Sequence, residues 1–308
     1  TVFRLRDEDQ IAVLEMGISD FGEMARLTKI AKPDTCVITN IGTCHLENLG
    51  DRDGVLKAKT EIFQSMKTNG HIVLNGDDDK LITVREYNGV KPVFFGLNSE
   101  RDVYADQIES KGLKGVACRI HLGEDAFDVL VPTPGIHMVY NALAAAAVGR
   151  IYGLTIEEIR RGIESLETIR GRFKMIETDK FLVVDDCYNA NPMSMKASLD
   201  VLHDGEGRRV AILGDMGELG EDEAALHEGV GIHAATCGID ACVCVGDLAV
   251  HIAEAARKAN PDFPVYYEKT RESLLEHLND YVQKGDTILV KASHFMKFEE
   301  VVKALEEM

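Results

Sequence analysis

Several common signatures of ligand binding are missing from this chain of 308 residues. The phosphate-binding motif GxxxxGK[ST] occurs nowhere, and the segment 214–220, GDMGELG, lacks the GxGxxG spacing of a dinucleotide-binding turn. That segment is either a turn that leads into a helix or a ligand contact. Tryptophan is absent, and no apolar run approaches the roughly 20 residues of a membrane span. The sequence therefore predicts no membrane partner.

Positive charge is scarce as well. Lys and Arg total 34 against 52 Asp and Glu, which gives a net charge of −18. This excess of negative charge disfavours non-specific binding to nucleic acid or to an anionic membrane surface. An anionic substrate would need local cations, a metal ion or a helix N-terminus to hold it. We therefore expect no nucleic-acid partner.

The seven cysteines do not form the CxxC spacing of a zinc or redox site. Most of them lie inside apolar runs, and Cys242 and Cys244 alternate along one such run. We interpret them as reduced packing residues of a cytoplasmic protein, with metal binding as the alternative.

Short apolar runs that end in a polar residue recur along the chain, separated by segments with helical periodicity. Runs of this kind, apolar without alternation, are typical of parallel strands covered on both faces. They occupy residues 11–14, 37–39, 72–74, 181–184, 210–213, 241–245 and 287–290. The predicted fold class is therefore α/β with mostly parallel sheets, in which ligands bind beyond the carboxyl ends of the strands.

The pattern changes between about residues 91 and 131, where short alternating segments follow one another without helices. We predict an antiparallel insert at the edge of the first sheet. Residues 167–174 have no apolar periodicity, so we place a domain boundary between residues 169 and 170. Residues 170–308 are then predicted to form a Rossmann-like domain. Helices are expected from about residue 53, in a stretch that opens at residues 132–135 and contains 141–148, and over 156–166, 194–202, 223–235, 249–259 and 271–283.

Lys59 is unusual in the helix predicted from about residue 53. It shares one side of that helix, at helical spacing, with apolar residues, namely Val55, Ile62 and Met66. A buried ammonium group requires a partner, a lowered pKa or a covalent change. Alternatively, the apolar stem of Lys59 lies along the protein while its charge reaches water.

Two further residues could act together with Lys59. Glu15 follows one predicted strand and His45 follows the next. A carboxylate and an imidazole suit a divalent cation, and Mg²⁺ takes few protein ligands while substrate phosphates supply others. The structural alternatives are a helix N-cap for Glu15 and a satisfied core histidine for His45.

The second half contains DDCYNANP at 185–192, with more carboxylates and amides than a simple turn needs. Together with other segments it makes the chain resemble the Mur ligase family along nearly its whole length. These segments are EMG at 15–17, NIGTCHL at 40–46, AKTEI at 58–62, GIHMVYNA at 135–142, GR at 171–172, GDMGELG at 214–220 and KAS at 291–293. The resemblance implies a central P-loop-type ATPase domain at 1–169 and a C-terminal ligase domain at 170–308.

The resemblance also implies an activity and its site. The DDxYNANP and GDMxELG signatures point to the member that joins D-alanyl-D-alanine to UDP-N-acetylmuramoyl-tripeptide in peptidoglycan synthesis, using ATP and Mg²⁺ through an acyl phosphate. Glu15, His45 and a carbamylated Lys59 would be the catalytic metal site. The remaining roles would be adenine contact for Asn141 and His137, phosphate contact for Arg172, ribose contact for Asp186, and contact with the nucleotide or the dipeptide for Tyr188, Asn189, Asn191 and Lys291.

The chain departs from the family pattern in places. Met138 stands where asparagine is usual, Ala292 replaces a glycine, and His294 stands where arginine is common. The family's N-terminal domain and phosphate loop would precede Thr1, and residues 1–5 begin as if inside a strand. We therefore expect a monomeric fragment, truncated at its N-terminus, that does not catalyse ligation alone, because the β- and γ-phosphates would lack the loop's amides. Two alternatives stay open: a related Mur or folylpolyglutamate-type ligase with another amino-acid substrate, and a non-catalytic nucleotide-binding module.

Overall fold

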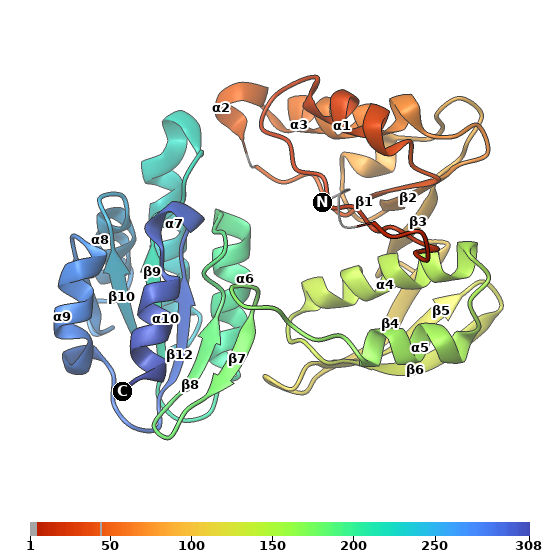
Figure 1. Cartoon of the computed structure of the whole chain (residues 1–308). Coiled ribbons are helices and arrows are strands. Elements are labelled where there is room, and N and C mark those ends of the chain that lie inside the picture. Colours follow the sequence, from red (N-terminus) through yellow and green to blue (C-terminus); the bar gives the residue numbers. More distant parts are fainter. Residues whose placement is uncertain (1–4, 44) are drawn as a thin grey trace.

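The computed structural model describes residues 5–43 and 45–308. Residues 1–4 of the strand expected at the N-terminus, and Cys44 of the NIGTCHL segment, lie outside the described residues. Within the described part, strands form two six-stranded sheets on either side of the segment that joins α5 (Ile156–Glu164) to β7 (Lys174–Glu177) (Figure 1). The chain therefore folds as two α/β layers in succession, as its strand pattern predicts.

The first sheet has the order β1-β2-β3-β4-β5-β6. Its strands are β1 (Thr35–Ile38), β2 (His71–Asn75), β3 (Val93–Gly96), β4 (Val103–Ser110), β5 (Val116–Leu122) and β6 (Asp125–Val131). Strands β1 to β4 pair in parallel, whereas β4, β5 and β6 pair antiparallel. The antiparallel edge insert is thus confirmed, but β3 belongs to the parallel part. Strand β5 alternates buried and half-buried residues because one face packs on the core.

The prediction of a strand at residues 11–14 is wrong. These residues have no regular structure, and Ile11 and Val13 are 65% and 92% exposed. An apolar run becomes a parallel strand only where neighbouring elements cover both of its faces. In the described part of the chain β1 is the outermost strand of its sheet, and no strand pairs with residues 11–14.

The helices of the first domain position its strand ends. They are α1 (Glu23–Ala31), α2 (Leu46–Leu49), α3 (Arg52–Thr60), α4 (Ile136–Ile151) and α5 (Ile156–Glu164). Helix α3 begins where the Asp51 carboxylate accepts the backbone N–H of Gly54, and a 3₁₀ turn η2 (Glu61–Ser65) follows it. Helix α4 buries small residues against the sheet, among them Ala142, Ala146 and Ala147.

The second sheet has the order β11-β10-β9-β12-β8-β7. Its strands are β7 (Lys174–Glu177), β8 (Leu182–Asp185), β9 (Arg209–Gly214), β10 (Ala241–Val245), β11 (Val265–Glu268) and β12 (Thr287–Lys291). The four predicted strands are confirmed as β8, β9, β10 and β12. The sequence missed the edge strands β7 and β11, whose residues are only partly buried and so lack a continuous apolar run.

Helices cover both faces of the second sheet. They are α6 (Pro192–His203), α7 (Glu223–Thr236), α8 (Ala249–Ala259), α9 (Arg271–Tyr281) and α10 (Glu299–Glu306). One core contains side chains of α6, α7 and α8 with Cys242 and Cys244, and the other contains side chains of α9 and α10 with Val243. The six described cysteines are free thiols. Burial raises the pKa of the Cys36 thiol to about 12, so it is a packing group rather than a nucleophile.

Among the described residues, none of the helices combines the length and the apolar character that crossing a membrane requires.

Candidate functional site

The carboxyl ends of β8 and β12 bring a buried ion pair to the edge of the second sheet. Lys291 is 3% exposed, and its Nζ donates to Asp186 Oδ2 at 2.6 Å and to the Asn189 carbonyl at 3.1 Å. The hydroxyl of Ser198 on α6 donates to the same Asp186 oxygen at 2.7 Å. The Asp186 carboxylate therefore compensates the charge of the Lys291 ammonium group. The hydrogen bond from Lys291 to the Asn189 carbonyl holds the turn that carries Asn189 against β12.

A second set of contacts places Arg172 beside this turn. The Gly171 N–H donates to Asp185 Oδ2 at 2.9 Å, and the Tyr188 N–H donates to the Gly171 carbonyl at 3.0 Å. Gly171 has φ +77°, and a Cβ there would come within 3.0 Å of the Tyr188 Cβ, so the position favours glycine. As a result the Arg172 guanidinium lies 4.1 Å from the centroid of the exposed Tyr188 ring. The centroid of the His294 ring lies 5.4 Å from the centroid of the same Tyr188 ring.

The first turn of α4 brings His137 from the other domain toward the ion pair. Crowding by protein atoms lowers the pKa of His137 although part of its side chain reaches solvent. Asp186 opposes this shift and Lys291 adds to it, so all three groups lie within electrostatic range of one another. The structure thus gathers four of the predicted nucleotide and substrate residues, His137, Asp186, Asn189 and Lys291.

Asn141 lies one turn further along α4 and borders a cavity of about 460 Å³ between α4 and α5. Its amide nitrogen lies 3.4 Å from the sulfur of Met138. The cavity wall is mostly apolar and includes small residues such as Ala145 and Gly149. A flat, largely apolar group suits such a wall, with one amide at its rim for orientation.

Sequence reasoning missed the residues that hold α4 in place. Asp77, just after β2, accepts hydrogen bonds from Arg101 Nε at 3.0 Å and from the Tyr140 hydroxyl at 3.2 Å. Burial, followed by the charge of Asp77, raises the pKa of Tyr140 to about 12. The only signal in the sequence was the polar NGD segment that follows the run at 72–74.

The three residues of the predicted metal site have different partners in this structure. His45 Nδ1 lies 2.7 Å from Glu218 Oε2, and Glu15, with a side chain 90% exposed, lies 3.9 Å from an Arg172 nitrogen. Lys59 is half-buried, and its Nζ donates to the Asn40 carbonyl at 2.8 Å. Among the described residues no group of three or more His, Cys, Asp or Glu side chains has the arrangement of a metal site.

These contacts bear on whether the residues suit Mg²⁺. The imidazole of His45 and the exposed carboxylate of Glu15 are group types that can ligate a divalent cation. Both residues fit a site that relies mainly on water and phosphate oxygens. Lys59 is a hydrogen-bond donor here, and only carbamylation would give it a ligand oxygen.

Asn191 and Asn189 have structural roles in the same turn. The Asn191 Oδ1 accepts the Ser194 N–H at 2.9 Å, and the Ser194 hydroxyl accepts the Asn191 N–H at 3.1 Å, which forms a capping box at the start of α6. The Asn189 Oδ1 accepts the Ala190 N–H at 2.8 Å.

The GDMGELG segment lies between β9 and α7, and its residues are tied to neighbouring strand ends. Asp215 caps α8 by accepting the N–H groups of Leu248 and Ala249 at 3.1 and 2.7 Å. The Gly217 N–H donates to the Ser293 hydroxyl at 2.9 Å, which joins the segment to the end of β12. The segment is thus part of the same edge of the sheet as Lys291.

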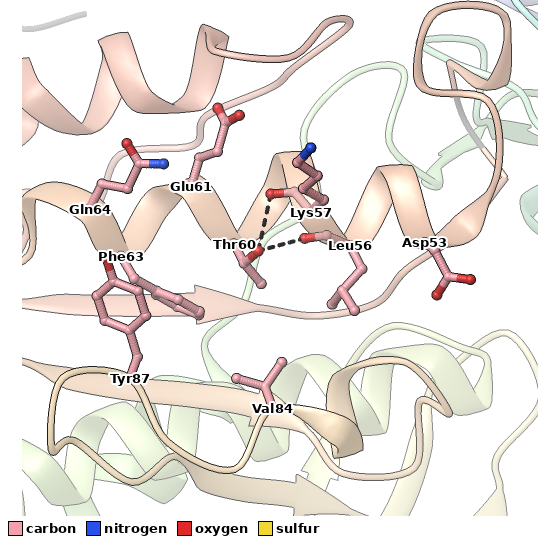
Figure 2. Close-up of a pocket in the computed structure, with 9 residues that line it drawn as sticks. All are labelled: Asp53, Leu56, Lys57, Thr60, Glu61, Phe63, Gln64, Val84 and Tyr87. Carbon is pink, nitrogen blue, oxygen red and sulfur yellow. Dashed lines mark hydrogen bonds between the residues drawn. The ribbon is translucent and has the colours of Figure 1, made fainter.

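A second cavity, of about 480 Å³, lies between α3, η2 and the loop around Tyr87 (Figure 2). The rings of Phe63 and Tyr87, with centroids 5.3 Å apart, form part of its wall, and the Thr60 hydroxyl points back to carbonyls of its own helix. None of the predicted site residues lines it. It is therefore separate from the site at the domain junction.

Family comparisons agree with this geometry. The Mur ligase middle domain matches residues 1–149, and the family described as Mur ligase, glutamate ligase domain matches residues 171–294. A protein of Bacillus subtilis is 36% identical over the whole chain, and one of Escherichia coli is 35% identical over the whole chain. This chain therefore belongs to the Mur ligase family.

The particular relatives share one name. The proteins of B. subtilis and E. coli are both called UDP-N-acetylmuramoyl-tripeptide–D-alanyl-D-alanine ligase, and the chain spans 66% and 68% of their lengths. A crystal structure of MurF from Acinetobacter baumannii superposes with a TM-score of 0.89 at 32% identity, over 99% of this chain and 66% of that one. MurF of Thermotoga maritima in complex with ADP has a TM-score of 0.79 at 28% identity, over 94% and 65% of the two chains. The chain thus spans about two thirds of the relatives it matches.

Proposed function

We propose that this chain is the nucleotide-binding and acceptor-binding part of an ATP-dependent ligase that joins D-alanyl-D-alanine to UDP-N-acetylmuramoyl-tripeptide in peptidoglycan synthesis. The observation that carries the proposal is the 35–36% identity, along the whole chain, with two relatives named for this reaction. The junction of polar residues from both domains supports it, because the reaction has to hold two substrates together. We place the protein in the cytoplasm as a monomer, with the domain boundary between residues 169 and 170.

The proposed reaction proceeds in two steps. The terminal carboxylate of the tripeptide accepts the γ-phosphoryl group of ATP to give an acyl phosphate, and ADP leaves. The amine of D-alanyl-D-alanine then attacks the acyl carbon, and phosphate leaves as the amide bond forms. Mg²⁺, held by Glu15 and His45 and by Lys59 once carbamylated, would neutralise the charge of the phosphates.

The chain's own residues suggest how the nucleotide is held. Asn141, at the rim of the apolar cavity, and His137 would orient the base. Arg172 is exposed and stacked on Tyr188, so its guanidinium can face phosphate oxygens without leaving a buried partner unpaired. The Asp186 carboxylate would accept a hydrogen bond from the ribose.

The turn that follows β8 would hold the dipeptide. Lys291 already uses two of its N–H groups on Asp186 and Asn189. Its role is therefore to fix the turn that carries Tyr188, Asn189 and Asn191 beside the incoming amine.

Nucleotide binding is tested by titrating the 308-residue chain with ADP in a calorimeter. We expect Asn141→Ala to weaken ADP binding about tenfold, as the loss of one good hydrogen bond predicts. Lys303→Ala, on the exposed face of α10, should leave the affinity unchanged. Equal affinity in the two variants would contradict the assignment of Asn141.

Ligation is tested with the chain itself and with a chimera. In the chimera, the segment of the B. subtilis relative that precedes its match to Thr1 is joined to Thr1. We expect no substrate-dependent ADP release from the chain, which contains no phosphate-binding motif, and ligation of D-alanyl-D-alanine by the chimera. Ligation by the chain would contradict the first expectation. A chimera that uses another amino acid favours a related ligase, and one that binds ADP without ligation favours a nucleotide-binding module.

A further inference from the structure

The chain just beyond β1 is held by side chains rather than by strand pairing. Strand β1 pairs with β2 as far as its last residue, Ile38. Beyond that point the Asn75 side-chain amide donates to the Thr39 carbonyl at 3.1 Å, and Arg52 Nε donates to the Ile41 carbonyl at 3.0 Å. Side chains from β2 and α3 thus fix the start of the NIGTCHL segment.

One peptide group in this stretch, between Asn40 and Ile41, is bonded on both sides. Its carbonyl accepts a hydrogen bond from Lys59 Nζ at 2.8 Å, and its N–H donates to Asp78 Oδ2 at 2.7 Å. A trans peptide group is planar, so its N–H and its C=O point in opposite directions within one plane. A partner that fixes the N–H therefore also fixes the direction in which the carbonyl meets Lys59.

Asp78 is itself well anchored. Its side chain is 9% exposed, and its second carboxylate oxygen, Oδ1, accepts the N–H groups of Lys80 and Leu81 at 3.0 Å each. Ile41, on the other side of the contact, is 2% exposed. Water does not readily replace the bond that a buried N–H makes, so this contact is a stable part of the fold.

The bond at one end of the peptide group also strengthens the bond at the other end. A carboxylate that accepts the N–H leaves more negative charge on the carbonyl oxygen, which then becomes a better acceptor. Hydrogen bonds to charged groups are also roughly twice as strong as those between neutral groups. The contacts that Asp78 and Lys59 make with this peptide group therefore support each other.

We propose that Asp78 is a positioning residue for Lys59, acting through the peptide group between Asn40 and Ile41. Asp78 orients the carbonyl, and the carbonyl holds the Nζ atom of Lys59. A carbamate nitrogen keeps an N–H, so the same carbonyl would orient Lys59 both as an amine and as a carbamate. The inference rests on the proposed role of Lys59 in the ligase site. It gives a function to one acid of the NGDDD segment that follows β2.

The test follows both ends of the peptide group by NMR in the chain labelled with ¹⁵N at isoleucine and lysine. Ile41→Val and Lys59→Met identify the two signals. Asp78→Ser keeps a short acceptor for the turn that follows it but cannot reach Ile41. In this variant we expect the Ile41 N–H to exchange with solvent on the order of tenfold faster, and the Lys59 Nζ signal to shift. Loss of the turn alone would not move the Lys59 signal.

Asp79 provides the matched control. It lies next to Asp78, is exposed, and pairs with Arg52. Asp79→Ala should therefore leave the Ile41 and Lys59 signals unchanged. The same changes in Asp79→Ala, or an unmoved Lys59 signal in Asp78→Ser, would overturn the proposal.

A reciprocal variant decides the matter if Asp78→Ser does not fold. Lys59→Met removes the donor at the carbonyl end and keeps a side chain of similar length. Because both bonds share one peptide group, we expect the Ile41 N–H signal to move to higher field and its exchange to quicken. An unchanged Ile41 signal would contradict the coupling. The spectra need neither nucleotide nor substrate, so their outcome is independent of whether the chimera ligates.

Discussion

Lys291 and Lys59 show two environments for a lysine away from water. Lys291 is almost fully buried and is paired with a carboxylate, whereas Lys59 is half-buried and donates to the Asn40 carbonyl. A buried ammonium that loses its carboxylate keeps its desolvation cost without compensation. The stability of the site edge therefore depends on Asp186 in addition to any role of that residue in binding.

Removal of the Asp186 carboxylate should destabilise the protein strongly. We expect Asp186→Ala to lower the free energy of unfolding by about 3 kcal/mol or more, because it leaves Lys291 buried and unpaired. The control is Glu307→Ala, which removes the partner of Lys303 in an exposed pair and should cost less than about 1 kcal/mol. Urea unfolding of both variants measures the difference. Equal losses would show that the burial of Lys291 does not matter.

His227 supplies a pH-dependent contribution to stability. Its buried ring donates from Nδ1 to the Glu223 carbonyl at 2.7 Å and accepts the Met216 N–H on Nε2 at 2.9 Å. Burial lowers the pKa of His227, although the bond to Glu223 and the charge of Asp215 oppose the shift, and His251 adds to it. The neutral form is thus the one the fold requires, since a protonated Nε2 would face a backbone N–H.

The sign of the pH effect follows from this shift. An unfolded histidine titrates near pH 6.5, above the pKa of folded His227, so the unfolded state takes up the proton first as the pH falls. Stability is complete above about pH 7 and declines below about pH 6.5, by at most about 1.4 kcal/mol per pH unit. Urea unfolding between pH 7 and 5 should show a shallower decline for His227→Gln than for the unaltered chain. Parallel curves would contradict this assignment.

At the scale of single elements, helix starts explain two residues that the family pattern marks. Asn191 caps α6, and Asp215 caps α8. Each satisfies backbone N–H groups that a helix leaves free at its start. The same carboxylates and amides stand at the carboxyl edges of the sheets, so a capping role and a binding role overlap in the sequence pattern.

Substitution of Asn191 distinguishes these two roles. We expect Asn191→Ala to lower the free energy of unfolding by about 1 kcal/mol, and Asn191→Asp to restore most of it, because aspartate caps as well as asparagine. If Asn191 only caps α6 and does not contact the nucleotide, the ADP affinity measured by calorimetry should stay unchanged in both variants. A loss of affinity without a loss of stability would favour direct contact.

At the scale of the whole molecule, the strands divide cleanly along the chain. The first sheet ends with β6, the second begins with β7, and the segment between α5 and β7 includes exposed Leu166 and Ile169. Few contacts protect such a segment, which is where domain boundaries usually fall. The division between residues 169 and 170 remains a prediction that this separation supports.

Limited proteolysis tests the boundary. We expect a glutamate-specific protease to cut first at Glu167, in irregular exposed chain, and to leave two folded fragments. Glu124 serves as an internal control, since it is also exposed but lies in the tight turn between β5 and β6. Mass spectrometry identifies the fragments, and circular dichroism shows whether they stay folded. First cleavage at Glu124 would argue against the boundary.

The sequence alone determined what depends on local periodicity and on motifs. The non-alternating runs that became β8, β9, β10 and β12, the alternating segment at β5, and the helices α6, α7, α8 and α9 were predicted, because burial on one or two faces leaves a repeat in neighbouring residues. The motif segments likewise indicated the family. Both kinds of information are contained in short stretches of chain.

The tertiary structure decided which distant residues meet. Residues 11–14 carry the apolar run of a strand yet pair with none of the described strands, because pairing requires a neighbour and not only a pattern. The pairing of His45 with Glu218, and the approach of His137 to Lys291 and Asp186, depend on how two domains dock. Docking is set by surfaces assembled from separate segments, so no local pattern in the sequence records it.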